Sequence, residues 1–289
     1  MKLRRRLVPY GLLAPGTIWL VLFFVVPMYF MAELALRSGT FTEGFTFTWE
    51  WANFPDALAG RGQQVVRTFI YSGVATILAL LIAYPLAYAI AVRASPRWRL
   101  LLLFAVIAPF FTTYLIRTIA WKTILADSSP LVDVLQVLAV IPDDGRVLAT
   151  SGAVIAGLTY NFLPFMILPI YASLERIDLS LIEAAKDLYS SARQAFLRVT
   201  LPLTAPGIVA GVLLTFIPAF GDYVNALFLG SPNQAMIGNK IQSLYLSDRN
   251  YPEAAALSFL MMAAILIVVV IYIRAAGTEA FMGEEEEAR

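Results

Sequence analysis

Residues 254–273 read AAALSFLMMAAILIVVVIYI, an apolar run without a charged side chain. A helix of about 20 apolar residues crosses the hydrocarbon core of a bilayer, so this run predicts a transmembrane helix. Other charge-poor runs recur along the rest of the chain. They predict an all-α integral membrane protein with a single transmembrane domain over residues 1–289, whose six spans lie at about 7–32, 68–92, 100–121, 147–174, 206–228 and 254–273.

The composition independently excludes a soluble globule. Of the 289 residues, 60% are hydrophobic and 14% are charged, against about 45–50% and about 25% in soluble domains. The mean hydropathy is +0.74. The sequence has no His and no Cys, which excludes zinc sites built from these residues, thiol nucleophiles and His general bases. We therefore expect a non-catalytic chain without a metal site, and an intramembrane enzyme is disfavoured.

The distribution of Lys and Arg predicts the orientation, because basic residues collect on the cytoplasmic side of a membrane protein. With six spans both termini share one side, and that side holds 13 of the 21 basic residues. Its net charge is +4, against −3 on the other side. Both termini are therefore expected in the cytoplasm. The first run is too long for a signal peptide and is expected to be an uncleaved span, and the acidic run 284–287 is expected to be solvated.

The cytoplasmic segment 175–205 is longer than the usual helix connector of about 2–8 residues. Ser180 and Glu183 fit a capping box at the start of a helix. Apolar residues then recur at helical spacing, at Leu181, Ala184, Leu188, Ala192, Ala195 and Val199. We predict an amphipathic cytoplasmic helix here, with a small-residue patch at Ala184–Ala185.

This segment resembles the EAA loop of ABC importer permeases. The resemblance rests on Glu183-Ala-Ala-Lys-Asp-Leu-Tyr-Ser-Ser and on Leu201-Pro202 downstream. It implies a coupling helix between spans 4 and 5 that docks on a separate ATPase, through Glu183, Ala184, Ala185, Asp187, Leu188, Tyr189, Leu201 and Pro202. Tyr189 departs from the family, which usually has Gly there for a tight turn. Capping and helix packing alone are the alternative explanation of Glu183-Ala-Ala.

Two further stretches, 109–121 and 160–171, are similar to polyamine permeases of the spermidine/putrescine type, specifically the first permease subunit. The resemblance implies a type I importer fold and alternating access in the bacterial inner membrane. It also implies a second six-span permease, an extracellular or periplasmic solute-binding protein and two copies of an ATPase that holds ATP and Mg. The sequence agrees, because it contains no G-x-x-x-x-G-K-[ST] phosphate loop. No cofactor on this chain and no nucleic acid partner are expected.

Asp222 interrupts the outer half of the fifth predicted span. A carboxylate at membrane depth costs roughly 2.5–3.5 kcal/mol on insertion scales, so it should face a cavity or a partner. A path for extended cations is expected to contain a carboxylate and aromatic rings for cation–π contacts. The candidate residues for such a path are Asp222, Tyr223, Tyr114, Trp121 and Tyr160. Arg117 lies at comparable depth and opposes a cation path unless it is neutralised. The alternatives are an ion pair between Arg117 and Asp222, or a place for Asp222 among the headgroups.

Other features leave alternatives open. Gly207 and Gly211 permit a close helix contact, either within the chain or with the second permease. Aromatic residues in the outer loop 33–67 are expected to be interfacial anchors, with docking of an outer partner as the alternative. A surface helix is expected near 131–138. The cargo alternatives are iron, sulfate, thiamine, phosphonate or opine-type solutes, and a stand-alone secondary transporter is the alternative mechanism.

Overall fold

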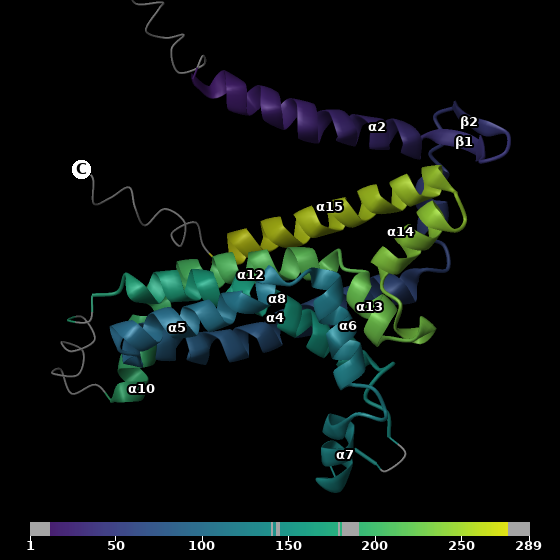
Figure 1. Cartoon of the computed structure of the whole chain (residues 1–289). Helices are drawn as coiled ribbons and strands as arrows, with labels where there is room; N and C mark the ends of the chain where they lie inside the picture. The colour runs from purple at the N-terminus through teal and green to yellow at the C-terminus, as the bar shows by residue number, and fades with distance from the viewer. Residues whose placement is uncertain (1–11, 140, 143–144, 179, 181–190, 277–289) are drawn as a thin grey trace, which may run out of the picture. The chain divides into compact units, whose positions relative to one another are not determined.

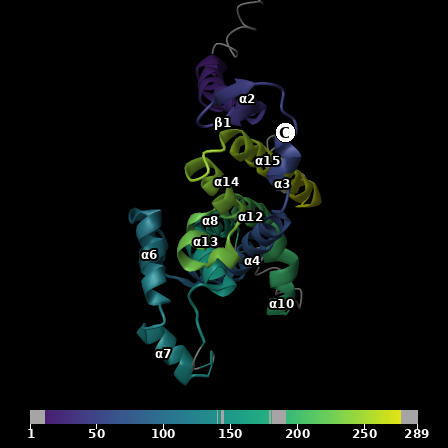
Figure 2. The same cartoon turned by 90° about the vertical axis from the view of Figure 1, so that its right-hand side faces the viewer.

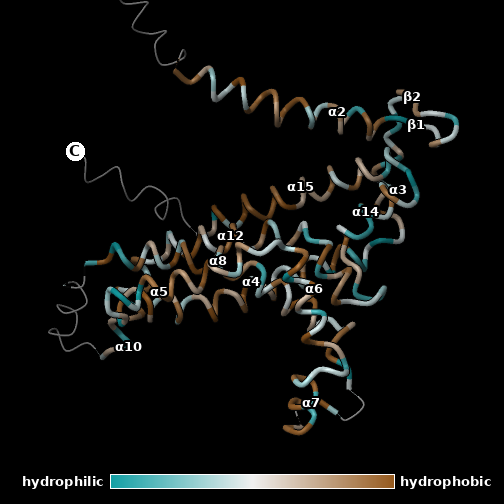
Figure 3. Tube along the Cα trace, in the orientation of Figure 1, coloured by the Kyte–Doolittle hydropathy of each residue, from teal (hydrophilic) through white to brown (hydrophobic). Residues whose placement is uncertain are grey.

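The computed structural model describes residues 12–139, 141–142, 145–178, 180 and 191–276. Helices long and apolar enough to cross a membrane run over Leu12–Ala35, Gly62–Arg93, Ser151–Glu175 and Tyr251–Ala275. Two bent helix pairs pass the same test together, which brings the number of candidate spans to as many as six in the described part of the chain. Figure 3 shows hydrophobic residues along the helix labelled α15. The predicted all-α membrane fold is confirmed.

The contacts divide the chain into two compact units, residues 1–62 with 240–264 and residues 63–239 with 265–289. The first unit begins with the helix Leu12–Ala35, which contains a π-helical turn, η1 (Val21–Val25), and ends in α2 (Val26–Ala35). A two-stranded antiparallel hairpin follows, with β1 (Arg37–Thr40) paired to β2 (Gly44–Phe47) so that Arg37 lies opposite Phe47. The unit also contains α3 (Asn53–Leu58), most of α14 (Ile237–Leu246) and the first half of α15 (Tyr251–Ala276).

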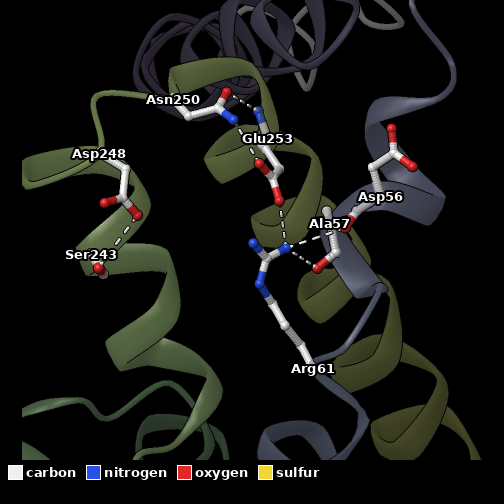
Figure 4. A network of polar contacts seen from close by, with 7 residues as sticks. All are labelled: Asp56, Ala57, Arg61, Ser243, Asp248, Asn250 and Glu253. Atoms are coloured by element: carbon white, nitrogen blue, oxygen red, sulfur yellow. Dashed lines mark hydrogen bonds and ion pairs between the residues drawn. The ribbon is translucent and has the colours of Figure 1, made fainter.

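Arg61 joins α3 to the start of α15 within this first unit (Figure 4). Its Nη1 lies 2.5 Å from Oε1 of Glu253 and 2.6 Å from the carbonyl oxygen of Ala57. Asn250 donates to the other carboxylate oxygen of Glu253 at 2.6 Å. One guanidinium therefore satisfies a carbonyl at the end of a short helix and a carboxylate in the first turn of a long one.

The second unit holds most of the helices, whose arrangement Figures 1 and 2 show from two sides. Its elements in chain order are α4 (Gly62–Tyr88), η2 (Ala89–Arg93), α5 (Pro96–Ile107), η3 (Ala108–Phe111), α6 (Tyr114–Ile124), α7 (Pro130–Val137), α8 (Ser151–Glu175), α10 (Ala192–Ala195), η4 (Phe196–Thr200), α11 (Leu201–Leu203), α12 (Ala205–Phe220), α13 (Val224–Leu229) and η5 (Pro232–Gln234). Side-chain caps begin several of them, α7 and α8 among them. The hydroxyl of Thr150 accepts from the amide of Ala153 at α8, and Ser129 accepts from Val132 at α7. The expected surface helix near 131–138 is confirmed as α7.

The core of this unit centres on α8, which packs against α12 and α4. A Cβ added at Gly207 would lie 2.5 Å from the carbonyl oxygen of Pro169, and one at Gly211 would lie 3.1 Å from that of Met166. The two glycines therefore allow the α12 backbone to approach α8 closely. Of the two alternatives for this glycine pair, the structure supports a contact within the chain.

Two predicted spans differ from the structure. The helix expected over 100–121 is broken, since α5 and α6 meet at a bend of 96° after the 3-10 turn that contains Pro109. The helix expected over 206–228 ends at Phe220, after which Gly221–Tyr223 lead into the short α13. Proline lacks the amide hydrogen that a continuing helix needs, which accounts for the first break. Pro164 and Pro169, in contrast, lie inside the unbroken α8.

The segment 175–205 is also interrupted. A continuous helix from 181 to 199 was expected, but Ser191 has an extended backbone and begins a new helix, α10. Its hydroxyl accepts from the amide of Gln194 while the Gln194 side chain accepts from the amide of Ser191, a complete capping box. Leu201 and Pro202 lie in α11, just before a bend of 63° into α12. The other predicted coupling residues, Glu183, Ala184, Ala185, Asp187, Leu188 and Tyr189, lie outside the described residues.

Candidate functional site

Asp222 lies in the three-residue break between α12 and α13. α12 ends at Phe220, and α13 begins at Val224. Asp222 is 7% exposed. An ionised carboxylate is buried only when other groups replace the hydrogen bonds of water, so its partners decide what this residue can do.

All the hydrogen bonds described for the Asp222 carboxylate come from uncharged donors. The Tyr114 hydroxyl, on the first turn of α6, donates to Oδ2. The backbone amide of Asn225 donates to Oδ1 at 2.8 Å, and the Asn225 side chain donates to the same oxygen at 3.3 Å. Both carboxylate oxygens therefore act as hydrogen-bond acceptors in this network.

Two further polar residues extend this network into α8 and α6. The Asn161 amide donates to Oδ1 of Asn225 at 3.1 Å and to the Thr118 hydroxyl at 3.3 Å. Asn161, Asn225 and Thr118 are each at most 1% exposed. Together with Tyr114 and Asp222 these residues form the Asp222 cluster, which joins the break after α12 to α6 and α8.

A glycine on α8 makes room for this cluster. A Cβ added at Gly157 would lie 2.5 Å from Oδ1 of Asn225 and 2.3 Å from a methyl carbon of Leu229. Only a residue without a Cβ permits α13 to lie this close to α8. The side-chain amide of Asn225, on the short helix α13, therefore lies directly against the α8 backbone at Gly157.

Arg117 does not neutralise Asp222. Its guanidinium carbon lies 4.1 Å from the ring centre of Phe110 and 5.9 Å from that of Tyr114, and Arg117 is 9% exposed. Its Nε and Nη1 are buried without a hydrogen bond in the described part of the chain, and no ion pair with Asp222 is present there. The expected alternative, an Arg117–Asp222 pair, is therefore replaced by a cation–π contact.

The remaining candidates fall into separate contacts. Trp121 and Tyr160 pack edge to face with ring centres 5.2 Å apart. Tyr223 is 39% exposed, and its carbonyl accepts from the Asn239 side chain at 2.8 Å. Sequence reasoning thus named Asp222 and Tyr114, which do meet.

Sequence reasoning missed Asn161 and Asn225. Both lie inside predicted spans, where a buried amide is costly without partners. A search of the spans for all polar side chains, and not only for charged ones, finds them. Asn161 stands directly after Tyr160, which was already a candidate.

The fold thus places broken helices of membrane-spanning composition around a buried carboxylate. Residues 17–277 match the family described as the inner membrane component of binding-protein-dependent transport systems, and the chain belongs to this family. Several relatives bear the name spermidine/putrescine transport system permease protein PotB, among them one from Haemophilus influenzae and one from Escherichia coli K12. The one from Haemophilus influenzae is 38% identical over 260 residues, covering 89% of this chain and 90% of that protein. The one from Escherichia coli K12 is 40% identical over 202 residues, covering 70% and 73%.

A solved structure with the same fold is that of a bacterial ABC transporter involved in the import of the acidic polysaccharide alginate. The TM-score is 0.72 at 20% identity, and the match covers 95% of this chain and 96% of that chain. The sequence-based prediction of an ABC importer permease fold is confirmed.

Proposed function

We propose that this chain is the permease subunit of an ATP-driven importer of polyamines such as spermidine and putrescine. The observation that carries the proposal is the 38% identity to a spermidine/putrescine permease over nine tenths of both proteins. Cargo and mechanism then follow from the site and from the cytoplasmic segment.

The Asp222 cluster supports a cationic cargo. Because the carboxylate is held by the hydroxyl of Tyr114 and the amide groups of Asn225, its negative charge is not cancelled by a fixed cation. A passing ammonium group would be attracted to that charge and to the ring of Tyr114. Arg117 rests on Phe110 instead, so its charge is partly compensated by an aromatic face. Trp121, Tyr160 and Tyr223 would line the path on either side.

Energy would come from another chain. The sequence lacks a phosphate loop, so ATP and Mg are assigned to a separate ATPase, present in two copies, and this chain is non-catalytic. The ATPase would dock on the segment 175–205 through Glu183, Ala184, Ala185, Asp187, Leu188 and Tyr189. Movement there would reach the spans through Leu201 and Pro202, which lie beside the 63° bend into α12.

The complete importer would contain a second six-span permease and a periplasmic solute-binding protein, in the bacterial inner membrane. The excess of basic residues on the side of both termini supports a cytoplasmic location for them. A stand-alone secondary transporter would need ion-coupling acids in several spans. Asp222 is the one acidic residue of the sequence that falls inside the six predicted spans, which disfavours this alternative.

Uptake of radiolabelled spermidine by cells that carry the complete importer tests the site. Asp222→Asn keeps the shape of the side chain and removes its charge, so we expect uptake to fall at unchanged membrane expression. Asp133→Asn is the matched control, because Asp133 is exposed on α7. Equal uptake by the two variants would show that Asp222 does not act on the transported solute. Uptake of an anionic solute in place of spermidine would contradict the proposal of a cationic cargo.

A further inference from the structure

A row of exposed aromatic side chains follows the hairpin of the first unit. Phe47, Trp49, Trp51 and Phe54 form a continuous row of ring contacts, with successive ring centres 4.9, 6.4 and 5.9 Å apart. The first pair meets edge to face, and the other two pairs are stacked. Trp49 and Trp51 remain 62% and 61% exposed. We call these four residues the aromatic loop. Exposed stacked indoles are unusual on a water-facing surface.

Backbone hydrogen bonds fasten this loop to the end of α2. The amides of Thr48 and Glu50 both donate to the carbonyl oxygen of Leu36, at 3.4 and 2.9 Å. The side-chain amide of Asn53 donates to the carbonyl oxygens of Ala35 and Arg37, at 2.9 and 2.8 Å. The loop thus satisfies carbonyl groups that the end of a helix leaves free, and Trp49 and Trp51 are held at the level of that end.

The length of the helix Leu12–Ala35 indicates how deep in the bilayer the end of α2 lies. Leu12–Ala35 has 24 residues, which span about 36 Å at 1.5 Å per residue, while the hydrocarbon core is about 30 Å thick. Its large apolar side chains, Leu22 and Phe24 among them, are exposed along its length, as expected of a helix that faces lipid. The end of α2 must therefore lie where the hydrocarbon core meets the headgroups.

The backbone of Trp49 is held in a strained conformation that supports a role for its side chain. Its φ is 55°, in the left-handed region that bulky residues rarely adopt. The hydrogen bonds on either side of it, from Thr48 and Glu50 to Leu36, fix this conformation. Strain of this kind persists where the surrounding structure imposes it, and here the constraint holds an indole outward.

We propose that the aromatic loop is a lipid anchor whose indoles insert into the headgroup interface at the membrane face where α2 ends. Trp is favoured there because its ring is apolar and its N–H still reaches water and headgroup oxygens. The anchor fixes the height of the hairpin, and through Asn53 the height of α3, relative to the bilayer.

Tryptophan fluorescence of the full-length protein in vesicles of phosphatidylcholine and phosphatidylglycerol tests the anchor. The chain has five Trp residues, so replacing Trp19, Trp98 and Trp121 by Phe leaves Trp49 and Trp51 as reporters. We expect blue-shifted emission, with stronger quenching by lipids spin-labelled near the top of the acyl chain than by lipids labelled near its terminus. Adding Trp49→Phe and Trp51→Phe gives the Trp-free baseline.

Three results would overturn the proposal. The first is water-like emission quenched fully by acrylamide and by neither lipid. The second is stronger quenching from the deep label, which places the indoles in the hydrocarbon core. The third is emission that shifts only when a solute-binding protein is added, which makes the loop a docking surface for a protein.

Discussion

The side-chain amide of Asn225 donates a 2.5 Å hydrogen bond to the hydroxyl of Tyr114, and this contact joins α13 to α6. The same amide group donates to Asp222 and accepts from Asn161. Asn225 therefore links the segment after α12 to both α6 and α8, beside the direct hydrogen bond from Tyr114 to Asp222.

Exchanging the two side chains tests this role. Asn225→Asp removes the donor to Tyr114 and sets a second carboxylate beside Asp222. An uncompensated buried charge costs about 3 kcal/mol or more, so we expect a lower melting temperature and a lower yield of monodisperse protein.

The double variant Asn225→Asp with Asp222→Asn restores one carboxylate and one amide, and we expect it to recover much of the lost melting temperature. A single Asn225→Asp variant as stable as the native protein would show that the two side chains do not share a buried network.

The α8–α12 contact makes Gly207 sensitive to the smallest substitution. In Gly207→Ala the new Cβ would press on the carbonyl oxygen of Pro169, and overpacking of this kind costs about 1–3 kcal/mol. Thermal unfolding in detergent measures the loss.

Gly73→Ala provides the control, because a Cβ at Gly73 of α4 meets nothing within 4 Å. Alanine is the better helix former by up to about 1 kcal/mol, so this variant should be neutral or slightly more stable. If both glycines tolerate alanine equally, the close approach of the two helices is not required for stability.

The Arg61 contacts predict a local effect in the first unit. Arg61→Ala leaves the partly buried Glu253 and the Ala57 carbonyl without their shared donor, at a cost of about 1–2 kcal/mol. We expect faster amide hydrogen exchange over α3 and the first turn of α15, and a smaller effect for Glu253→Gln, which keeps an acceptor. Asp248→Asn is the control, since Asp248 is exposed and contacts Ser243 at 3.5 Å. Unchanged exchange in Arg61→Ala would mean that the ion pair does not hold these elements together.

The coupling segment predicts a loss of assembly when the charge of Glu183 is reversed. Glu183→Arg should lower the amount of ATPase that copurifies with the permease. Glu286→Arg makes the same change in the acidic tail and should leave the complex intact. Equal recovery of the ATPase with both variants would remove Glu183 from the docking surface.

The sequence predicted the fold well where apolar runs are long and uninterrupted. Residues 68–92, 147–174 and 254–273 each fall within or beside one long helix, because their length and hydropathy leave few other solutions in a bilayer. The bend between α5 and α6 was not predicted, since Pro109, Pro164 and Pro169 look alike in the sequence. Neighbouring contacts decide which proline ends a helix and which one is accommodated within it.

The candidate site was predictable only in part. Asp222 and Tyr114 are conspicuous by residue type, but their hydrogen bond spans 108 positions of sequence. The place of Arg117 over Phe110 depends on the turn between α5 and α6. Asn161 and Asn225 matter because Gly157 lets α13 approach α8, a relation that no local pattern contains.

The most direct test of the central claim is spermidine uptake by proteoliposomes that contain this permease, its second permease, the ATPase and the solute-binding protein. We predict uptake that depends on ATP hydrolysis, that stops when the ATPase is left out, and that falls in Asp222→Asn. Spermidine accumulation by this chain alone, driven by an ion gradient without ATP, would contradict the account.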